Sequence, residues 1–138
     1  MKGFITGAAM LLLLMVFPLQ TALEMANEVR MTVFSDIVHL SVQRARVDGY
    51  FKSSTITELK QSLLNAFPDL SEGEIYIDVT TTPKYRLDVF DIREAIFYDI
   101  RIPVRGIIAV PQLFGIEADR NRYTSRRSGM VLSELPMP

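Results

Sequence analysis

The feature that most constrains this chain is a long stretch without any charged side chain, residues 3–23. Its centre holds four consecutive leucines, Leu11, Leu12, Leu13 and Leu14. As a helix rising about 1.5 Å per residue, the stretch would be about 30 Å long, which matches the hydrocarbon core of a bilayer. Lys2 precedes it and Glu24 follows it, and a single early cation favours a cytoplasmic N-terminus with the remainder outside. The sequence therefore predicts one membrane-spanning helix.

The helical pattern continues beyond this stretch. Apolar side chains recur every three or four residues, at Ala26, Val29, Val33, Ile37 and Leu40. The pattern is widened on one side by Phe34, Val38 and Val42. From Leu19 to Asp48 neither glycine nor proline interrupts it, and Asp48-Gly49 is a typical helix stop. We predict one continuous helix over residues 4–47, apolar all round in its first half and amphipathic in its second.

A cleaved secretory signal peptide is the alternative interpretation of the N-terminus, because it too combines a short basic start with an apolar core. A small-x-small cleavage site near residues 22–26 would place Glu24 at the −3 position, which suits such a site poorly. The continuing helical pattern also favours a retained helix. Pro18 is expected to bend that helix, because its ring removes a backbone donor and clashes with the preceding turn.

The chain is predicted to consist of the long helix, residues 1–48, and a small extracellular domain, residues 49–138. In this domain residues 52–54 are read as a linker, and Thr55 with Glu58 as a capping box that opens a short helix. The apolar face of that helix is Ile56, Leu59, Leu63, Leu64 and Phe67. We expect the domain from about Phe51 onward to fold without the long helix, because its local signals agree with one another.

Three segments are predicted to be strands. Residues 74–81 alternate, with Ile75, Ile77 and Val79 on one side. Residues 95–108 are the longest candidate, where Pro103 indicates an edge position or a bulge, and residues 122–134 form a polar strand. Residues 110–116 read as an apolar turn, and residues 85–93 as a loop or a short strand. Short connections favour an antiparallel sheet, so the predicted fold class is α+β, with the long helix packed on a small sheet.

A long helix, half membrane-embedded and half amphipathic, followed by a small antiparallel sheet, resembles the type IV pilin superfamily. Gly3-Phe4 after the basic Lys2 resembles a prepilin peptidase site. Residues 98–104 and the apolar stretch that follows are similar to a strand phrase in TadE-like pseudopilins of tight-adherence (Tad) pili. Typical pilins carry glutamate as the fifth residue after the cleavage point, and cleavage after Gly3 would place Ala8 there.

The resemblance implies a structural or accessory subunit of a pilus-like extracellular filament, processed by a prepilin peptidase. Its partners would be the membrane and copies of itself or related subunits. Membrane insertion and assembly are assigned to Leu11, Leu12, Leu13, Leu14, Pro18, Ala26, Val29, Val33, Ile37 and Leu40. Close helix packing is favoured by the small side chains of Gly7, Ala8, Ala9, Ala22 and Ala26. The alternative is a non-polymerising, single-pass membrane-anchored binding or scaffold protein of a secretion or envelope complex.

The sequence offers few residues that could form a catalytic or metal-binding site. The chain has no cysteine and one histidine, His39, so thiolate sites and two-histidine metal sites are excluded. A net charge of −1 gives no general attraction to nucleic acid. We therefore predict no enzyme activity, no cofactor, no specific nucleic acid and no small-molecule substrate.

Three polar clusters have a possible binding or catalytic role, and the alternative for each is a solvated surface. An oxygen-rich loop around Gly73 fits either a calcium site or a solvated turn, and consists of Asp69, Ser71, Glu72 and Glu74. Paired carboxylates without a partner histidine are supplied by Asp88, Asp91 and Glu94. A basic cluster near Tyr123 fits either an anionic partner or a solvated strand face, and consists of Arg120, Arg122, Arg126 and Arg127.

Overall fold

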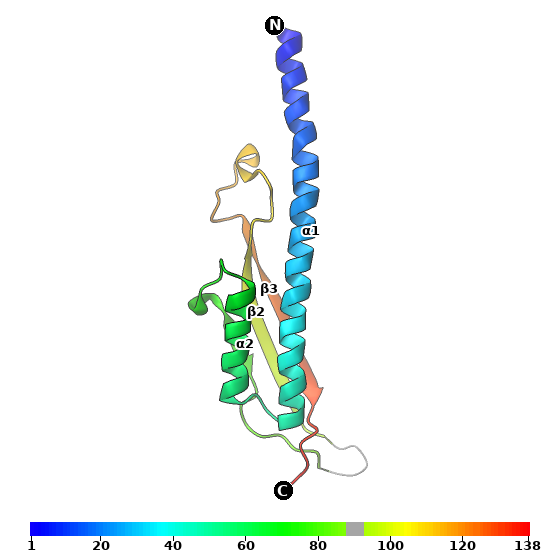
Figure 1. The fold of residues 1–138 in the computed structure, drawn as a ribbon, viewed down its shortest axis with the longest axis vertical. Coiled ribbons are helices and arrows are strands. Elements are labelled where there is room, and N and C mark those ends of the chain that lie inside the picture. Colours follow the sequence, from blue (N-terminus) through cyan, green and yellow to red (C-terminus); the bar gives the residue numbers. More distant parts are fainter. Residues whose placement is uncertain (88–92) are drawn as a thin grey trace. The chain divides into compact units, whose positions relative to one another are not determined.

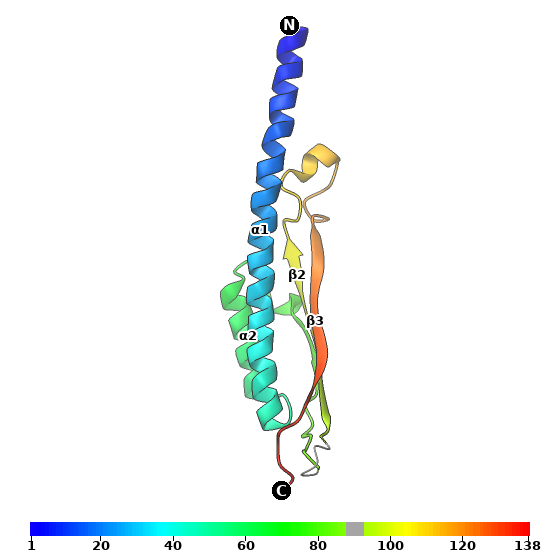
Figure 2. The same cartoon turned by 90° about the vertical axis from the view of Figure 1, so that its right-hand side faces the viewer.

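The computed structural model describes residues 1–87 and 93–138 (Figure 1). Its elements in chain order are α1 (Lys2–Asp48), α2 (Ser53–Ala66), the 3-10 helix η1 (Glu72–Glu74), β1 (Tyr76–Val79), β2 (Ala95–Arg105), the 3-10 helix η2 (Pro111–Phe114) and β3 (Arg122–Leu132). The strands form one sheet in the order β1-β2-β3, with neighbouring strands antiparallel (Figures 1 and 2). The predicted α+β class, with a long N-terminal helix and a small antiparallel sheet, is confirmed.

Tertiary contacts divide the chain into two compact units. Unit 1 comprises Met1–Met31 and Val104–Tyr123, and unit 2 comprises Thr32–Pro103 and Thr124–Pro138. α1 therefore contributes its first part to unit 1 and its second part to unit 2. This division differs from the predicted one at residue 48, because the second part of α1 belongs to the hydrophobic core of unit 2.

The core of unit 2 is built from both helices and from the sheet. α1 contributes Phe34, Val38, Val42 and Ala45. α2 contributes Leu59 and Leu63 from the predicted apolar face, and β2 contributes Ile96, Ile100 and Ile102. Ile75, Ile77 and Val79 of the β1 region also pack on this core, while Tyr76 is exposed. The predicted inward faces of α2 and β1 are therefore confirmed.

α1 ends where the Asp48-Gly49 pair predicts. Gly49 has a φ of 82°, a left-handed conformation that favours glycine, and its carbonyl accepts a hydrogen bond from the backbone N–H of Lys84. A Cβ at this position would lie 2.6 Å from the Lys84 carbonyl oxygen and 2.6 Å from a Leu135 methyl carbon. At the other end, α1 remains helical through Pro18, and the bend expected there stays a prediction.

The start of α2 differs from the prediction. The helix begins at Ser53, with Lys52 at the N-cap, so Thr55 lies inside the first turn and is buried. Glu58 pairs with Arg44 of α1 instead of reaching back to a cap. The predicted capping box is therefore wrong, and Ser53 and Ser54 are helical rather than linker. The physical reason is tertiary: buried Phe51 fixes where the chain enters the helix.

A capping box does occur, one element later. The Glu74 carboxylate accepts hydrogen bonds from the Ser71 backbone N–H at 3.1 Å and from the Ser71 hydroxyl at 2.8 Å. Glu74 therefore belongs to η1, and β1 begins at Tyr76, two residues later than predicted. The strand that was predicted over residues 74–81 is shorter for this reason.

β2 begins at Ala95 as predicted but ends at Arg105, before Gly106, which has a φ of 71°. It is the central strand, yet Pro103 is accommodated without loss of a ladder bond. The backbone N–H and C=O of Phe97 both point toward Thr80. Every second residue along β2, including Pro103, therefore directs its backbone groups toward the β1 edge. β1 starts at Tyr76, which pairs with Arg101, so Pro103 lies beyond the end of that strand. β3 also ends earlier than predicted, at Leu132.

Candidate functional site

Most of the first part of α1 is uncovered in the fold. Among the described residues, α1 is the one helix long and apolar enough to cross a membrane, and its most apolar stretch has no buried residue. The four central leucines are all exposed, as is Phe4 of the predicted processing site. Gly3 lies in the first turn of α1, with open space where a side chain would be. The fold leaves this segment free for lipid or for another helix.

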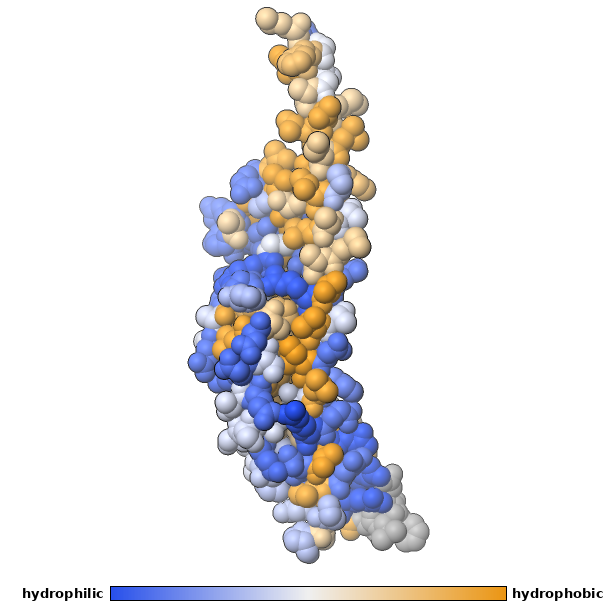
Figure 3. Space-filling model, viewed as in Figure 1, coloured by the Kyte–Doolittle hydropathy of each residue, from blue (hydrophilic) through white to orange (hydrophobic). Residues whose placement is uncertain are grey.

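Beyond the apolar stretch, α1 presents two different faces. The residues that widen the predicted pattern, Phe34, Val38 and Val42, are buried in the core of unit 2. Val29 and Leu40, by contrast, keep 63% and 64% of their surface exposed. Figure 3 shows apolar side chains around the first part of α1 and in a narrow stripe farther along the same helix. We call the exposed positions Ala26, Val29, Val33, Leu40 and Val47 the free face of α1.

Helix geometry separates these two faces. Successive residues turn by about 100° around a helix, so residues seven apart, such as Val33 and Leu40, lie nearly in line. Phe34 follows Val33 by one step and therefore points well away from it. Of the predicted stripe only Ile37 turns toward the core, where it is partly buried. Ile37 and Leu40 also line a shallow groove between α1 and α2, bordered by the ion pair of Arg44 with Glu58.

Unit 1 contains a closed loop that includes the predicted apolar turn, residues 110–116. We call residues 106–121 the apolar loop. Its ends are joined by a hydrogen bond of 2.9 Å from the Gly106 N–H to the Asn121 carbonyl. The buried Asn121 side chain accepts hydrogen bonds from the N–H groups of Ile107 and Ile108, at 3.0 and 2.8 Å, and donates one to the Ile108 carbonyl. The amide thus satisfies backbone groups that a chain reversal would otherwise leave unpaired.

Two polar side chains of α1 hold the apolar loop. The Gln20 amide donates to the Ile107 carbonyl at 3.0 Å and accepts from the Ala109 N–H at 2.9 Å. Asn27, two turns further along, donates to the Gly106 carbonyl at 3.0 Å. These bonds explain why a glutamine is tolerated near the end of an otherwise apolar segment, since its polar atoms are paired.

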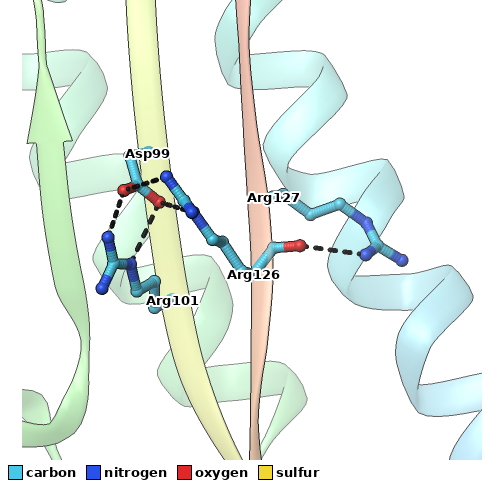
Figure 4. A network of polar contacts seen from close by, with 4 residues as sticks. All are labelled: Asp99, Arg101, Arg126 and Arg127. Carbon is cyan, nitrogen blue, oxygen red and sulfur yellow. Dashed lines mark hydrogen bonds and ion pairs between the residues drawn. The ribbon is translucent and has the colours of Figure 1, made fainter.

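The predicted arginine cluster is divided between the two compact units. Arg120 and Arg122 belong to unit 1, where Arg120 lies 3.9 Å from a Glu117 carboxylate oxygen. Arg126 and Arg127 belong to unit 2 and point to opposite faces of the sheet (Figure 4). Arg127 places its guanidinium 5.7 Å from the centre of the Phe34 ring. Within unit 2, therefore, the arginines are used in internal contacts.

Asp99 is the centre of a polar network on the outer face of the sheet (Figure 4). Arg126 binds its carboxylate in a two-pronged arrangement, with both distances 2.9 Å, and Arg101 binds the same carboxylate at 3.2 and 2.6 Å. Hydrogen bonds from Arg101 and then Arg126 lower the pKa of Asp99 to about 2. Asp99 lies opposite Asp78 in the β1–β2 register, so these arginines also offset the repulsion between two facing carboxylates.

A shallow hollow of about 520 Å³ lies over the same face of the sheet. It is lined by residues of all three strands, among them Tyr98, Asp99, Arg126 and Gly129. The Asp99 carboxylate in this lining is bound by the guanidinium groups of Arg101 and Arg126.

The remaining sequence candidates are placed as follows. His39 is exposed on α1 and lies 3.4 Å from the Gln43 amide. In the oxygen-rich loop, Glu74 is used in the η1 cap and Glu72 lies 3.7 Å from Lys60, and no metal-binding group of three such side chains occurs within residues 1–87 and 93–138. Glu94 accepts a hydrogen bond from the Tyr85 N–H. Its proposed partners Asp88 and Asp91 lie outside the described residues.

Comparisons with models of protein families, with curated proteins and with solved structures gave no match.

Proposed function

We propose that this chain is a membrane-anchored structural or accessory subunit of a pilus-like filament, which assembles with copies of itself through α1. The observation that carries the proposal is the free face. Val29 and Leu40 remain about two-thirds exposed although the opposite side of the same helix is fully packed. Contiguous apolar surface of this kind marks an interface. A helix that served only as an anchor would need no such face beyond the bilayer.

A second copy is the partner that best fits this face. The free face continues the uncharged stretch along one uninterrupted helix, so a helix that leaves lipid can exchange lipid contacts for contacts with other helices. Ala22 and Ala26, where the two parts meet, are small and exposed, which allows two backbones to approach closely. In this proposal the N-terminus is cytoplasmic, the sheet is extracellular, and a prepilin peptidase acts between Gly3 and Phe4.

Aspartate substitutions on the free face test the proposal. Val29→Asp and Leu40→Asp place a charge in the expected interface. Burying an unpaired charge there should lower the association constant between copies by well over tenfold. His39→Asp is the matched control, because it adds the same charge to an exposed position about 100° away from Leu40. We expect the first two variants to insert in the membrane normally but to lose higher-order assembly, and the control to assemble.

The readout is crosslinking and electron microscopy of surface material from the native host. Membrane fractionation of each variant shows that insertion is unchanged. If the unaltered chain yields only monomers, or if Leu40→Asp assembles as well as His39→Asp, the filament proposal fails. The non-polymerising anchored scaffold would then take its place.

A further inference from the structure

The tip of the apolar loop exposes large apolar side chains from a hydrogen-bonded turn. Leu113 and Phe114, both in η2, each keep 64% of their surface exposed. Beneath them Pro111 is buried, and the Ile116 N–H closes the turn on the Pro111 carbonyl at 3.0 Å. Gly115, with a φ of 68°, ends η2 in the left-handed conformation that such a turn needs. The loop is thus a fixed projection with apolar side chains at its tip.

The loop lies against the last turns of the membrane-length stretch of α1. Gln20, which holds Ile107 and Ala109, is inside the uncharged stretch, residues 3–23. Among residues 1–20, only Val16 and Gln20 are partly buried, and they occupy the same side of the helix. Both cartoon views show η2 beside α1 (Figures 1 and 2). The covered part of α1 therefore reaches into the segment that would lie in lipid.

Polarity changes along the loop in the direction expected at a membrane surface. The tip is apolar, whereas the segment that returns from the tip to Asn121 carries Glu117, Asp119 and Arg120, all exposed. Such an arrangement places charged groups in water when the tip is in lipid. The backbone groups nearest α1 are paired with Asn121 and Gln20, so partial burial in the interface leaves few of them unsatisfied.

We infer that Leu113 and Phe114 insert into the interfacial region of the outer leaflet of the membrane that α1 spans. The inference rests on the membrane-anchoring part of the proposed function and is independent of filament assembly. Lipid is the occupant to which the structure points, because the loop that carries the exposed tip is hydrogen-bonded to Gln20, inside the uncharged stretch of α1. Apolar side chains at this depth, about 5–10 Å into the boundary between headgroups and chains, are typical of interfacial anchors.

A single introduced tryptophan tests the inference, because the chain contains none. Phe114→Trp is placed in full-length protein reconstituted in phosphatidylcholine vesicles whose acyl chains are brominated either near the headgroup or near the chain ends. We expect blue-shifted emission and strong quenching by the shallow bromines, with weaker quenching by the deep ones. Leu13→Trp, at the centre of the apolar stretch, should show the opposite preference.

The control variants separate the possible failures. If Leu13→Trp is quenched by lipid but Phe114→Trp is quenched only by aqueous iodide, the loop inference is overturned while the anchor stands. If neither is quenched by lipid, the membrane anchor itself fails. Blue-shifted Phe114→Trp emission without lipid quenching would mean that protein covers the tip, which also overturns the inference. Phe97→Trp, at an exposed position on β2, should have its emission quenched by aqueous iodide. If lipid quenches Phe97→Trp as strongly as Phe114→Trp, the loop has no special contact with lipid.

Discussion

Asp99 shows how a single carboxylate organises one face of the sheet. Its two arginine partners approach from its own strand and from β3, so the network ties β2 to β3 through side chains. Since the hydrogen bonds act on the charged form, they favour ionised Asp99 in the folded chain and hold its pKa at about 2. An aspartate in an unfolded chain titrates near a pKa of about 3.9.

The pH dependence of stability follows from this difference. The contribution of ionised Asp99 is fully present above pH about 4 and is lost as the pH falls through about 2, because the unfolded chain takes up a proton first. Asp99→Asn removes this contribution. We expect the difference in unfolding free energy between the original chain and Asp99→Asn to shrink between pH about 4 and pH about 2, as measured by urea unfolding in detergent.

A companion variant identifies the cause of the shift. Arg126→Gln removes one of the two charged donors, so the pKa of Asp99 should rise toward its ordinary value while the carboxylate keeps Arg101. A nuclear magnetic resonance titration of the Asp99 carboxyl carbon measures this directly. An unchanged titration in Arg126→Gln, or an energy difference that does not vary with pH, would contradict the role assigned to the network.

The polar contacts of this protein could not be predicted from local sequence. Arg126 is 27 residues from Asp99, and Gln20 is 87 residues from Ile107, so no local pattern links the partners. Two weak signals existed nonetheless. Gln20 is a polar side chain in an apolar stretch, which calls for a partner, and Asp99 sits among the outward residues of a strand with Arg101 two positions away.

At the scale of elements, the ends of α1 were predictable and its packing face was not. Neither glycine nor proline occurs from Leu19 to Asp48, and the Asp48-Gly49 pair then predicts where the helix ends. The apolar pattern, however, is broad: Val33 and Phe34, like Ile37 and Val38, are adjacent apolar pairs. Periodicity alone cannot decide which member of each pair meets the sheet, since that depends on where the strands lie. The predicted start of α2 was wrong for a related reason, because the burial of Phe51 outweighed the local capping signal at Thr55 and Glu58.

The stop of α1 at Gly49 supplies a prediction for this junction. Gly49→Ala combines a left-handed backbone with a Cβ that would lie only 2.6 Å from the Lys84 carbonyl oxygen. We expect a loss of about 2–5 kcal/mol in unfolding free energy. Gly73→Ala is the matched control, since its new Cβ would meet no atom within 4 Å. Thermal or urea unfolding in detergent compares the two, and equal stability of both variants would show that the junction is not tightly fixed.

The two compact units change the expectation of how much of the chain folds by itself. A domain starting near Phe51 was expected to be independent, yet the core of unit 2 takes Phe34, Val38 and Val42 from α1. Burying side chains of this size contributes about 1.5–3 kcal/mol each. Their combined loss, about 5–9 kcal/mol, is comparable with the whole stability of a small domain, about 5–15 kcal/mol. The second part of α1 is therefore part of the folded domain.

Two truncated chains test this conclusion. A chain from Thr32 to Pro138 keeps every α1 residue of the core and should melt cooperatively, whereas a chain from Tyr50 to Pro138 should lack a cooperative transition by circular dichroism. Within the longer chain, Val42→Asp should abolish the transition, because it places a charge at a position only 3% exposed. Leu40→Asp, two residues earlier and 64% exposed, should leave the melt unchanged. A cooperative melt of the shorter chain, or equal effects of the two aspartates, would show that α1 is dispensable for the fold. The predicted contrast instead assigns one side of the helix to folding and leaves the other side available for assembly.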